Sequence, residues 1–406
     1  MIDLNQYKTQ LSTSDANLVT KQTALADAIG LGLPSARMEN WRYTNLKPVL
    51  EQCFDPVQTD KELSKDTLPE KTTTWPRLVF NNGHLISEFS DPAPAGISIT
   101  NEAIEKASFT DPDQVFECLN LALKNGGIDL AVSTGSKVDG LEILFLFDGQ
   151  ADQAAHLRNN IAVGSGAELS VLMTYCDQGS KLGWLNATNN ATVEAGAKLV
   201  HYSDISAPNA DFLNIRDFAT LNGGRYENHS LLTNCPSARH EVGFVTKAEN
   251  SEALLSGAFL GSDKQTLDTI TRASHLVPNC HSEQYYKGIV AGGGKTAFQG
   301  KVFVEKDAQK TVANQSCKNI ILDNGAEANV KPELLIYADD VKCAHGTTVG
   351  ELDETALFYL EQRGITPKEA KAILVNAFLE EIVDLVPAVE IQACFQAKIA
   401  RWMSEN

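Results

Sequence analysis

A short motif, a strand end followed by a turn of small residues, recurs through the middle of the chain. It occurs in four places, 163–169, 193–199, 221–226 and 322–328. In the two clearest copies Gly166 and Gly196 lie 30 residues apart. A strand–turn unit of this period is typical of a β-solenoid, in which each coil buries its apolar face on the next. Two flat sandwiches remain an alternative, because hairpins also alternate strands and turns.

The periodicity divides the chain into three predicted domains: a mixed, mainly helical domain (1–130), a central β domain (131–346) and a helical domain (347–406). In the first domain we expect a helix at 6–30, a second helical stretch at 46–50 into which residues 41–44 lead, a hairpin at 78–86 and a helix at 114–124. The hairpin prediction rests on an Asn-Asn-Gly turn between two strand-forming runs.

The last domain carries explicit helix signals. Asp353 can cap a first helix that Gly364 ends. Thr366 followed by Pro367 and Glu369 forms a capping box, worth about 1 kcal/mol, for a helix that ends before Pro387. A final helix is expected over 389–403. The wide apolar faces of these helices predict packing on their own domain, with part of the surface free for a partner.

Composition limits the possible partners. The net charge of −18 disfavours nucleic acid and anionic membranes, because both attract cationic surfaces. The sequence contains no run of about 18 apolar residues that could span a membrane, and its first residues lack the features of a signal peptide. We therefore expect a cytoplasmic protein that docks on other proteins.

Eight cysteines are spread singly over the chain, and none forms a CxxC pair. Local spacing therefore indicates neither a zinc ribbon nor a ferredoxin-type cluster site. A chain of this length needs no disulfide staples, so the thiols are expected to be reduced and mostly packed as small hydrophobic groups.

Two local motifs suggest chemistry that their context disfavours. The run 292–296, Gly-Gly-Gly-Lys-Thr, resembles the end of a phosphate-binding loop, but the required earlier glycine is Ile289 and the following residues are strand-forming. We therefore expect a turn and no nucleotide site. His275, Cys280 and His281 are also close in sequence. However, Cys280 and His281 would point to opposite faces of a strand, so a structural role is favoured over a shared metal.

Cys343-Ala344-His345 differs, because residues two apart on a strand share a face and a thiolate and an imidazole could converge there. Asp339 and Asp340 add nearby carboxylates. Two ligands leave a tetrahedral site incomplete. From the residues alone, a buried cysteine with a structural histidine stays the favoured interpretation. No Ser–His–Asp or paired-carboxylate arrangement stands out elsewhere.

The segment Lys331–Gly350 resembles the signature of the SufB/SufD family of iron–sulfur cluster assembly proteins. Segments 37–44, 275–287 and 300–315 resemble the same family. The Asp-Asp-Val-Lys-Cys-x-His-Gly wording favours the SufD branch over the SufB branch. Ala344 and Thr347 are small departures from the expected motif. Cys317 stands where a polar residue is expected, and packing is its favoured role.

The resemblance implies a right-handed parallel β-helix flanked by N-terminal and C-terminal helical domains. It also implies a scaffold without catalysis of its own or a stably bound cofactor. Such a scaffold pairs with a SufB-like paralogue and docks the ATPase SufC. Cys343 and His345 would then lie at the SufB junction, where iron or an iron–sulfur cluster forms transiently. The residues expected to dock the ATPase are Leu357, Phe358, Tyr359, Arg363 and Phe378. A homodimer of the isolated chain is also plausible.

Two other classes remain as alternatives. A β-helical carbohydrate-active enzyme would need a secretion signal, which the sequence does not suggest, and a carboxylate-rich groove, which the sequence cannot reveal. A self-associating structural solenoid would expose its repeat ends rather than follow them with capped helices.

Overall fold

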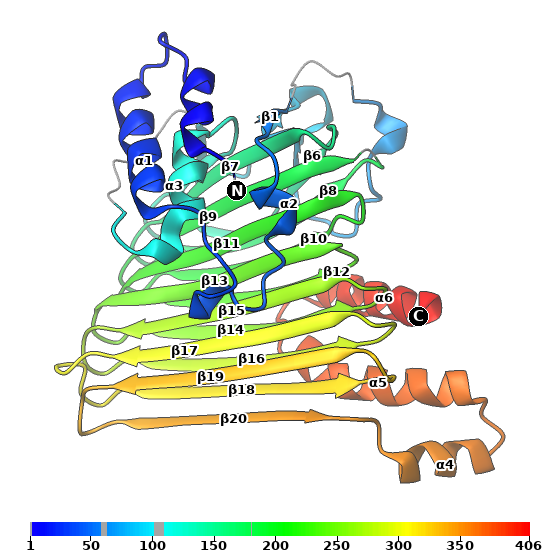
Figure 1. Cartoon of the computed structure of the whole chain (residues 1–406). Coiled ribbons are helices and arrows are strands. Elements are labelled where there is room, and N and C mark those ends of the chain that lie inside the picture. Colours follow the sequence, from blue (N-terminus) through cyan, green and yellow to red (C-terminus); the bar gives the residue numbers. More distant parts are fainter. Residues whose placement is uncertain (1, 58–62, 101–108, 180) are drawn as a thin grey trace.

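The fold is a parallel β-solenoid with helices at both ends (Figure 1). The computed structural model describes residues 2–57, 63–100, 109–179 and 181–406. From β5 onward, each strand pairs in parallel with the strand two further along the chain, so successive strands alternate between two facing sheets. The predicted solenoid is therefore confirmed, and the sandwich alternative is wrong because hairpins would pair successive strands antiparallel.

Each sheet contains ten of the described strands. Sheet A comprises β1 (Asp55–Pro56), β4 (Ile97–Thr100), β5 (Asp129–Val132), β7 (Gln153–Val163), β9 (Leu182–Val193), β11 (Ala210–Asn222), β13 (Ser237–Ala248), β15 (Thr266–His275), β17 (Lys295–Val304) and β19 (Glu327–Ile336). Sheet B comprises β2 (Arg77–Asn81), β3 (His84–Leu85), β6 (Lys137–Phe147), β8 (Glu168–Asp177), β10 (Lys198–Ser206), β12 (Arg225–Thr233), β14 (Glu252–Gly261), β16 (His281–Val290), β18 (Val312–Ile321) and β20 (Lys342–Gly350).

A recurring turn explains the sequence repeat. The residue two positions before every sheet B strand from β6 to β18 has a positive φ: Gly135, Gly166, Gly196, Gly223, Asn250, Asn279 and Lys310. Glycine adopts this left-handed conformation without steric cost and asparagine tolerates it. The repeat at 322–328 belongs to the opposite row of turns, since Gly325 lies two residues before the sheet A strand β19.

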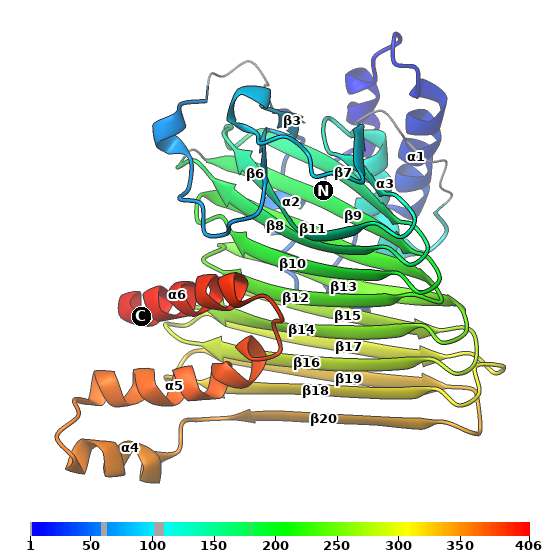
Figure 2. The ribbon, with the colours of Figure 1, turned by 180° about the vertical axis from the view of Figure 1, so that it is seen from behind.

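The space between the two sheets, here called the lumen, holds the largest core cluster. Leu169 and Leu199 occupy the same position on successive coils and are fully buried there. Alternate residues of each strand point into this core because the side-chain period of a strand is two. Helices cover part of the outer face of each sheet, N-terminal ones on the early coils of sheet A and C-terminal ones on sheet B (Figures 1 and 2).

The N-terminal helices are shorter than predicted. The 3-10 helix η1 (Leu4–Gln10) and the α-helix α1 (Leu18–Leu31) replace the single helix expected over 6–30. Between them the Asp15 side chain accepts from the Asn17 N–H, a local bond that competes with helix formation. The second helical stretch, predicted through Leu46, Val49 and Leu50, is confirmed as α2 (Lys47–Leu50), and the short η2 (Glu39–Trp41) precedes it.

Two other N-terminal predictions are confirmed. β2 and β3 form the predicted antiparallel hairpin, with Asn82 and Gly83 at positive φ in its turn. The helix expected at 114–124 is α3 (Val115–Ala122), preceded by η5 (Pro112–Gln114). The remaining 3-10 helices are η3 (Lys65–Thr67) and η4 (Ser87–Phe89).

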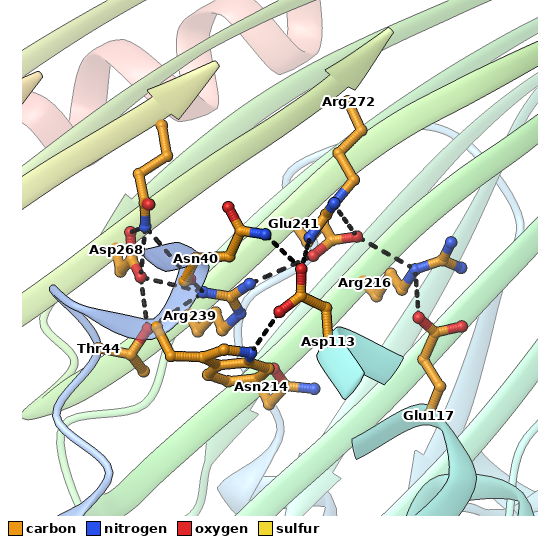
Figure 3. A network of polar contacts seen from close by, with 12 residues as sticks. Asn40, Thr44, Asp113, Glu117, Asn214, Arg216, Arg239, Glu241, Asp268 and Arg272 are labelled. Atoms are coloured by element: carbon orange, nitrogen blue, oxygen red, sulfur yellow. Dashed lines mark hydrogen bonds and ion pairs between the residues drawn. The ribbon is translucent and has the colours of Figure 1, made fainter. Parts of the chain in front are cut away.

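A buried polar network fastens the segment around Trp41 to sheet A (Figure 3). Arg239 donates to the Asn40 carbonyl at 2.8 Å and to the Thr44 hydroxyl and Asp268 carboxylate at 3.1 Å each. Its guanidinium lies 3.9 Å from the centre of the Trp41 ring. The Trp41 indole donates to Asp113 at 3.0 Å. These contacts give the motif around Trp41 a structural role.

The network continues along the same face through alternating charges. Arg216 bridges Glu117 of α3 and Glu241 of β13, and Arg272 bridges Glu241 and Asp113. Burial acts to raise the pKa of Glu241, but Arg272, Arg216 and Arg239 outweigh it and lower that pKa to about 2. Glu241 therefore stays ionised and connects two arginines on the sheet.

Three C-terminal helices follow the last strand: α4 (Glu354–Gln362), α5 (Pro367–Val383) and α6 (Val389–Glu405). The predicted Asp353 cap and the capping box of Thr366 and Glu369 are both present. α5 and α6 pack on the outer face of sheet B, whereas α4 extends beyond it (Figure 2). None of the helices in the described part of the chain is long and apolar enough to cross a membrane.

Candidate functional site

The solenoid ends in an open coil formed by β19 and β20. These strands are the last of sheets A and B, and neither pairs on its outer edge with another strand in the described residues. β18 alternates buried and partly exposed residues, whereas most of β20 is exposed. An unpaired edge presents free N–H and C=O groups that can pair with another chain.

Cys343 and His345 lie on this open coil and face the lumen. Cys343 is half-buried and packs against the lumenal core, in register with Ala313 of β18. His345, two residues along, shares that face, as the strand period predicted, and its side chain is exposed. Burial raises the pKa of the Cys343 thiol. The coil therefore offers one thiol and one imidazole at the mouth of the lumen.

The carboxylates of Asp339 and Asp340 do not complete a site. Both residues lie exposed in the turn before β20, where the Asp340 main chain bonds to Lys310 and Gln309 of the coil above. Within the described ranges no group of three or more His, Cys, Asp or Glu side chains could hold a metal ion. The chain itself thus supplies an incomplete ligand set.

Cys317 is a packed lumenal thiol one coil above this site. It is fully buried, and Asn319 donates to its sulfur at 3.3 Å. Burial raises its pKa to about 12, so the thiol stays protonated at neutral pH. A metal ligand must be a thiolate, so this position fits packing better than ligation.

Four of the five predicted docking residues gather on or beside α4. Phe358 and Tyr359 are 62% and 58% exposed, and Leu357 is half-buried. Arg363 donates to the Tyr359 hydroxyl at 2.9 Å, and α4 has no buried residue. Phe378 lies apart from them on α5, where its ring packs 4.4 Å from the Lys287 ammonium of β16.

The two disfavoured motifs are structural. Gly292 and Gly293 form a left-handed turn that leads into the strand β17, so the prediction of a turn is confirmed. His275 is buried 2.9 Å from the Ser282 hydroxyl. Cys280 is buried as well, whereas the exposed His281 contacts Glu283. These groups do not converge on one point.

The sequence analysis missed a charged cluster inside the lumen. Asp217 of β11 accepts from Asn189 and Ser203 and lies 3.0 Å from the ring of His240. Burial opposes its charge, but His201, His240 and the hydrogen bonds lower the Asp217 pKa overall. Its members come from four strands, and only their common inward position in successive coils could have revealed them.

A second cluster that the sequence analysis missed resembles the Ser–His–acid triad of hydrolases. His229 lies 2.7 Å from the Ser256 hydroxyl and 3.6 Å from the Glu227 carboxylate. Ser256 is nevertheless fully buried on the outer face of sheet B, and Glu227 is shared with Lys198 and Arg225. A substrate cannot reach this serine, so the cluster joins neighbouring strands and is no candidate active site.

Comparison with known proteins matches this architecture. The family model of the SUF system FeS cluster assembly SufBD core domain covers residues 145–378. The chain is 28% identical to the iron-sulfur cluster assembly protein SufD of Escherichia coli (strain K12), over 89% of this chain and 88% of that one. It is also 28% identical to the SufBD family protein slr0076 of Synechocystis sp., over 94% and 90% of the two chains.

A plant relative, the chloroplastic protein ABCI7 of Arabidopsis thaliana, is 26% identical over 88% of this chain and 80% of its own. The matched core runs from β6 to α5 and contains both Cys343 and His345. The resemblance predicted from the motifs is therefore confirmed. The chain belongs to the SufBD family of iron–sulfur cluster assembly proteins.

Proposed function

We propose that this chain is a scaffold subunit that pairs with a SufB-like paralogue through the open end of its solenoid. The observation that carries the proposal is the unpaired edge of β20, which bears Cys343 and His345 at the mouth of the lumen. A partner strand added to that edge would satisfy its free backbone groups. The same contact would bring further ligands to the two side chains.

The nascent iron–sulfur cluster is the cargo of this site. Iron takes thiolate and imidazole ligands, and a tetrahedral iron needs four. Cys343 and His345 supply two, so the partner and the incoming sulfide must supply the rest. A shared site of this kind releases its cargo when the two chains separate or shift, which suits a scaffold better than a stable cofactor site. We propose no catalytic activity for this chain alone.

The second partner in this proposal is a SufC-like ATPase that docks on α4. Exposed aromatic residues are enriched at protein interfaces, and Phe358 and Tyr359 lie on a helix with no buried residue. Arg363 beside Tyr359 adds a cation to the same patch. Phe378 contributes less, because it already packs on Lys287. A cytoplasmic location stays a prediction.

Self-association is the second candidate, favoured by the same edge. A second copy could pair along β20 when no paralogue is present. The membership in the SufBD family leaves no observation in favour of a carbohydrate-active enzyme.

The test is co-purification with SufB-like and SufC-like proteins, followed by cluster assembly on the complex. We expect Cys343→Ala and His345→Ala to form the complex but assemble few clusters. Cys53→Ala and His84→Ala are matched controls, because they remove a partly exposed thiol and an exposed imidazole near the N-terminal end of the solenoid, away from β20. Normal assembly by both site variants would refute the half-site. A complex that forms without the SufB-like chain, as a homodimer only, would favour self-association.

Docking is tested separately with Phe358→Asp. We expect this variant to lose the ATPase and keep the paralogue, because a buried unpaired carboxylate opposes an apolar interface. Loss of both partners, or of neither, would contradict the assignment of α4.

A further inference from the structure

A row of amide side chains in the lumen leads to His345. Gln284 of β16, Gln315 of β18 and His345 of β20 occupy the same register position on three successive coils. Neighbouring strands lie about 4.8 Å apart, so each side chain stacks over the next one along the solenoid. Stacked amides of this kind form hydrogen-bonded ladders in parallel, in-register sheets.

In the described part of the chain, the ladder lacks a bond at each end, at Gln284 Nε2 and at Gln315 Oε1, and only the second end faces β20. The Gln315 Nε2 group donates to Gln284 Oε1 at 3.1 Å, directed toward the coil above. The two polar ends of a primary amide point away from each other, so Oε1 of Gln315 is directed toward the coil below, which carries His345. Gln315 is only 2% exposed, and its Oε1 has no hydrogen-bond partner among the residues that the structure describes. Buried polar atoms are almost always bonded, so this acceptor calls for a donor.

The facing sheet leaves the amide little freedom. Gly300 of β17 lies across the lumen, and a Cβ at that position would come within 2.2 Å of Gln315 Nε2 and 2.7 Å of Oε1. The absence of a side chain at residue 300 thus makes room for the amide. By contrast, the residue in register above Cys343 is Ala313, which offers no polar side chain.

We propose that Gln315 is a positioning residue for His345: its carbonyl oxygen accepts the N–H of one imidazole nitrogen and leaves the other nitrogen free to bind iron. The inference rests on the proposed role of His345 as a cluster ligand. Metal-binding histidines almost always donate their second nitrogen to an oxygen, which fixes the tautomer and the ring orientation. Gln284 in turn accepts from Gln315 and orients its amide. The orientation of the His345 ring is therefore set by residues of this chain before a partner binds.

The test compares the His345 imidazole in the native chain and in Gln315→Met, which keeps the side-chain length but lacks the acceptor. With ¹⁵N-labelled histidine, nitrogen–proton correlation spectra report the tautomer of each of the eight histidines. The His345 signals are identified by their absence in His345→Ala. We expect one dominant tautomer in the native chain and a mixture in Gln315→Met.

Further variants separate positioning from simple packing. Gln315→Glu keeps an acceptor oxygen at the same reach and is expected to restore the single tautomer. Gly300→Ala is expected to lose it, because the added methyl displaces the amide without changing Gln315. Ser316→Ala alters the neighbouring residue on the opposite face of β18 and is expected to leave the spectrum unchanged. If Gln315→Met does not fold, Gln284→Met replaces it as the test. This variant removes the acceptor that orients the Gln315 amide, so the single His345 tautomer is again expected to be lost.

A second readout is the binding of Co²⁺ to the complex with a SufB-like chain, followed by its thiolate absorption. Loss of an outer partner of a metal ligand typically weakens metal binding 10–100-fold, and we expect a loss in this range for Gln315→Met. Identical His345 tautomer populations in the native chain and in Gln315→Met would overturn the inference. Normal cluster assembly by His345→Ala would instead refute the proposed function, whatever the tautomer spectra show.

Discussion

Replacing Arg239 with methionine would test whether the network in Figure 3 holds the N-terminal segment on sheet A. The Arg239 side chain is 1% exposed and its partner Asp268 is fully buried. Methionine keeps an apolar stem in the same space but removes the charge and the hydrogen bonds to Asn40, Thr44 and Asp268.

The magnitude follows from what remains around Asp268. Removing one partner of a buried ion pair costs about 3–5 kcal/mol, because the other charge loses its counterion. Burial already raises the pKa of Asp268, and Thr44 and Gln299 still donate to it in the variant. Because burial disfavours the charged form and Arg239 no longer opposes that effect, the carboxyl can take up a proton instead of staying charged. We expect a loss near the lower limit, about 3 kcal/mol at pH 7.

The sign of the pH dependence follows from the same proton. The folded variant binds a proton at Asp268 that its unfolded chain, with an aspartate pKa near 3.9, releases. Stability relative to the native chain should therefore recover as the pH falls from 7 toward 4. Urea unfolding followed by circular dichroism and tryptophan fluorescence measures both effects.

Arg225→Met is the matched control. Arg225 pairs with the carboxylates of Glu227 and Glu252, at 2.7 and 2.6 Å, but its side chain is 46% exposed. Solvent screens such pairs, so we expect a loss below about 1 kcal/mol. Equal losses in the two variants, or an Arg239→Met deficit that grows at low pH, would refute the reasoning.

Three further predictions concern other parts of the fold. Glu241→Gln should be less stable than the native chain at neutral pH, because arginines hold the pKa of the Glu241 carboxyl at about 2 in the folded chain despite burial. This difference in stability should disappear as the pH falls from about 4.5 toward 2, so that the acid unfolding profiles of the two chains converge. Lys287→Met removes the ammonium that donates to the Phe378 carbonyl and Glu381. The opening free energy of the α5 amides, measured by hydrogen exchange, should therefore fall by about 1–3 kcal/mol. Lys318→Met is the control, because its half-exposed ammonium also contacts Glu381 but should leave this free energy unchanged. Gly196→Ala should lower the free energy of unfolding by about 1–2 kcal/mol from backbone strain alone, because φ is +67° and an added Cβ would meet no atom within 4 Å. Gly346 also has open space around it but no positive φ, so a similar loss in Gly346→Ala would contradict this explanation.

The sequence was sufficient to predict the solenoid, but its repeat could be recognised in only some of the coils. Four early turns carry glycine at the left-handed position, and two of these glycines, Gly166 and Gly196, produced the visible 30-residue spacing. Asn250, Asn279 and Lys310 take the same conformation in later coils. Because the conformation is conserved while the residue type changes, the repeat fades in sequence although it continues in structure. The strongly capped C-terminal helices were predictable, because caps are local signals.

Long-range polar groupings could not be predicted in the same way. Arg239 and Asp268 become neighbours only through the register of β13 and β15, and Trp41 reaches them from the far N-terminal region. The pair Cys343 and His345 was predictable because a strand period of two acts within three residues. Its relation to Gln315 required the register of β18 and β20, which depends on the length of every intervening turn.

The position of β20 also suggests how an ATPase could act on the cluster site. Gly350 ends β20, and only three residues separate it from α4, of which Asp353 caps the helix and Leu352 packs on the C-terminal core. Such a short connection cannot absorb a rotation of α4. Among the described strands, β20 pairs with a neighbour on one edge only, as β19 does, so it resists such a movement less than the strands inside the sheet. α5, in contrast, is fixed to β16 through Lys287. If α4 holds the ATPase as proposed, its movement would reach the strand that carries Cys343 and His345 before it reached the rest of the solenoid.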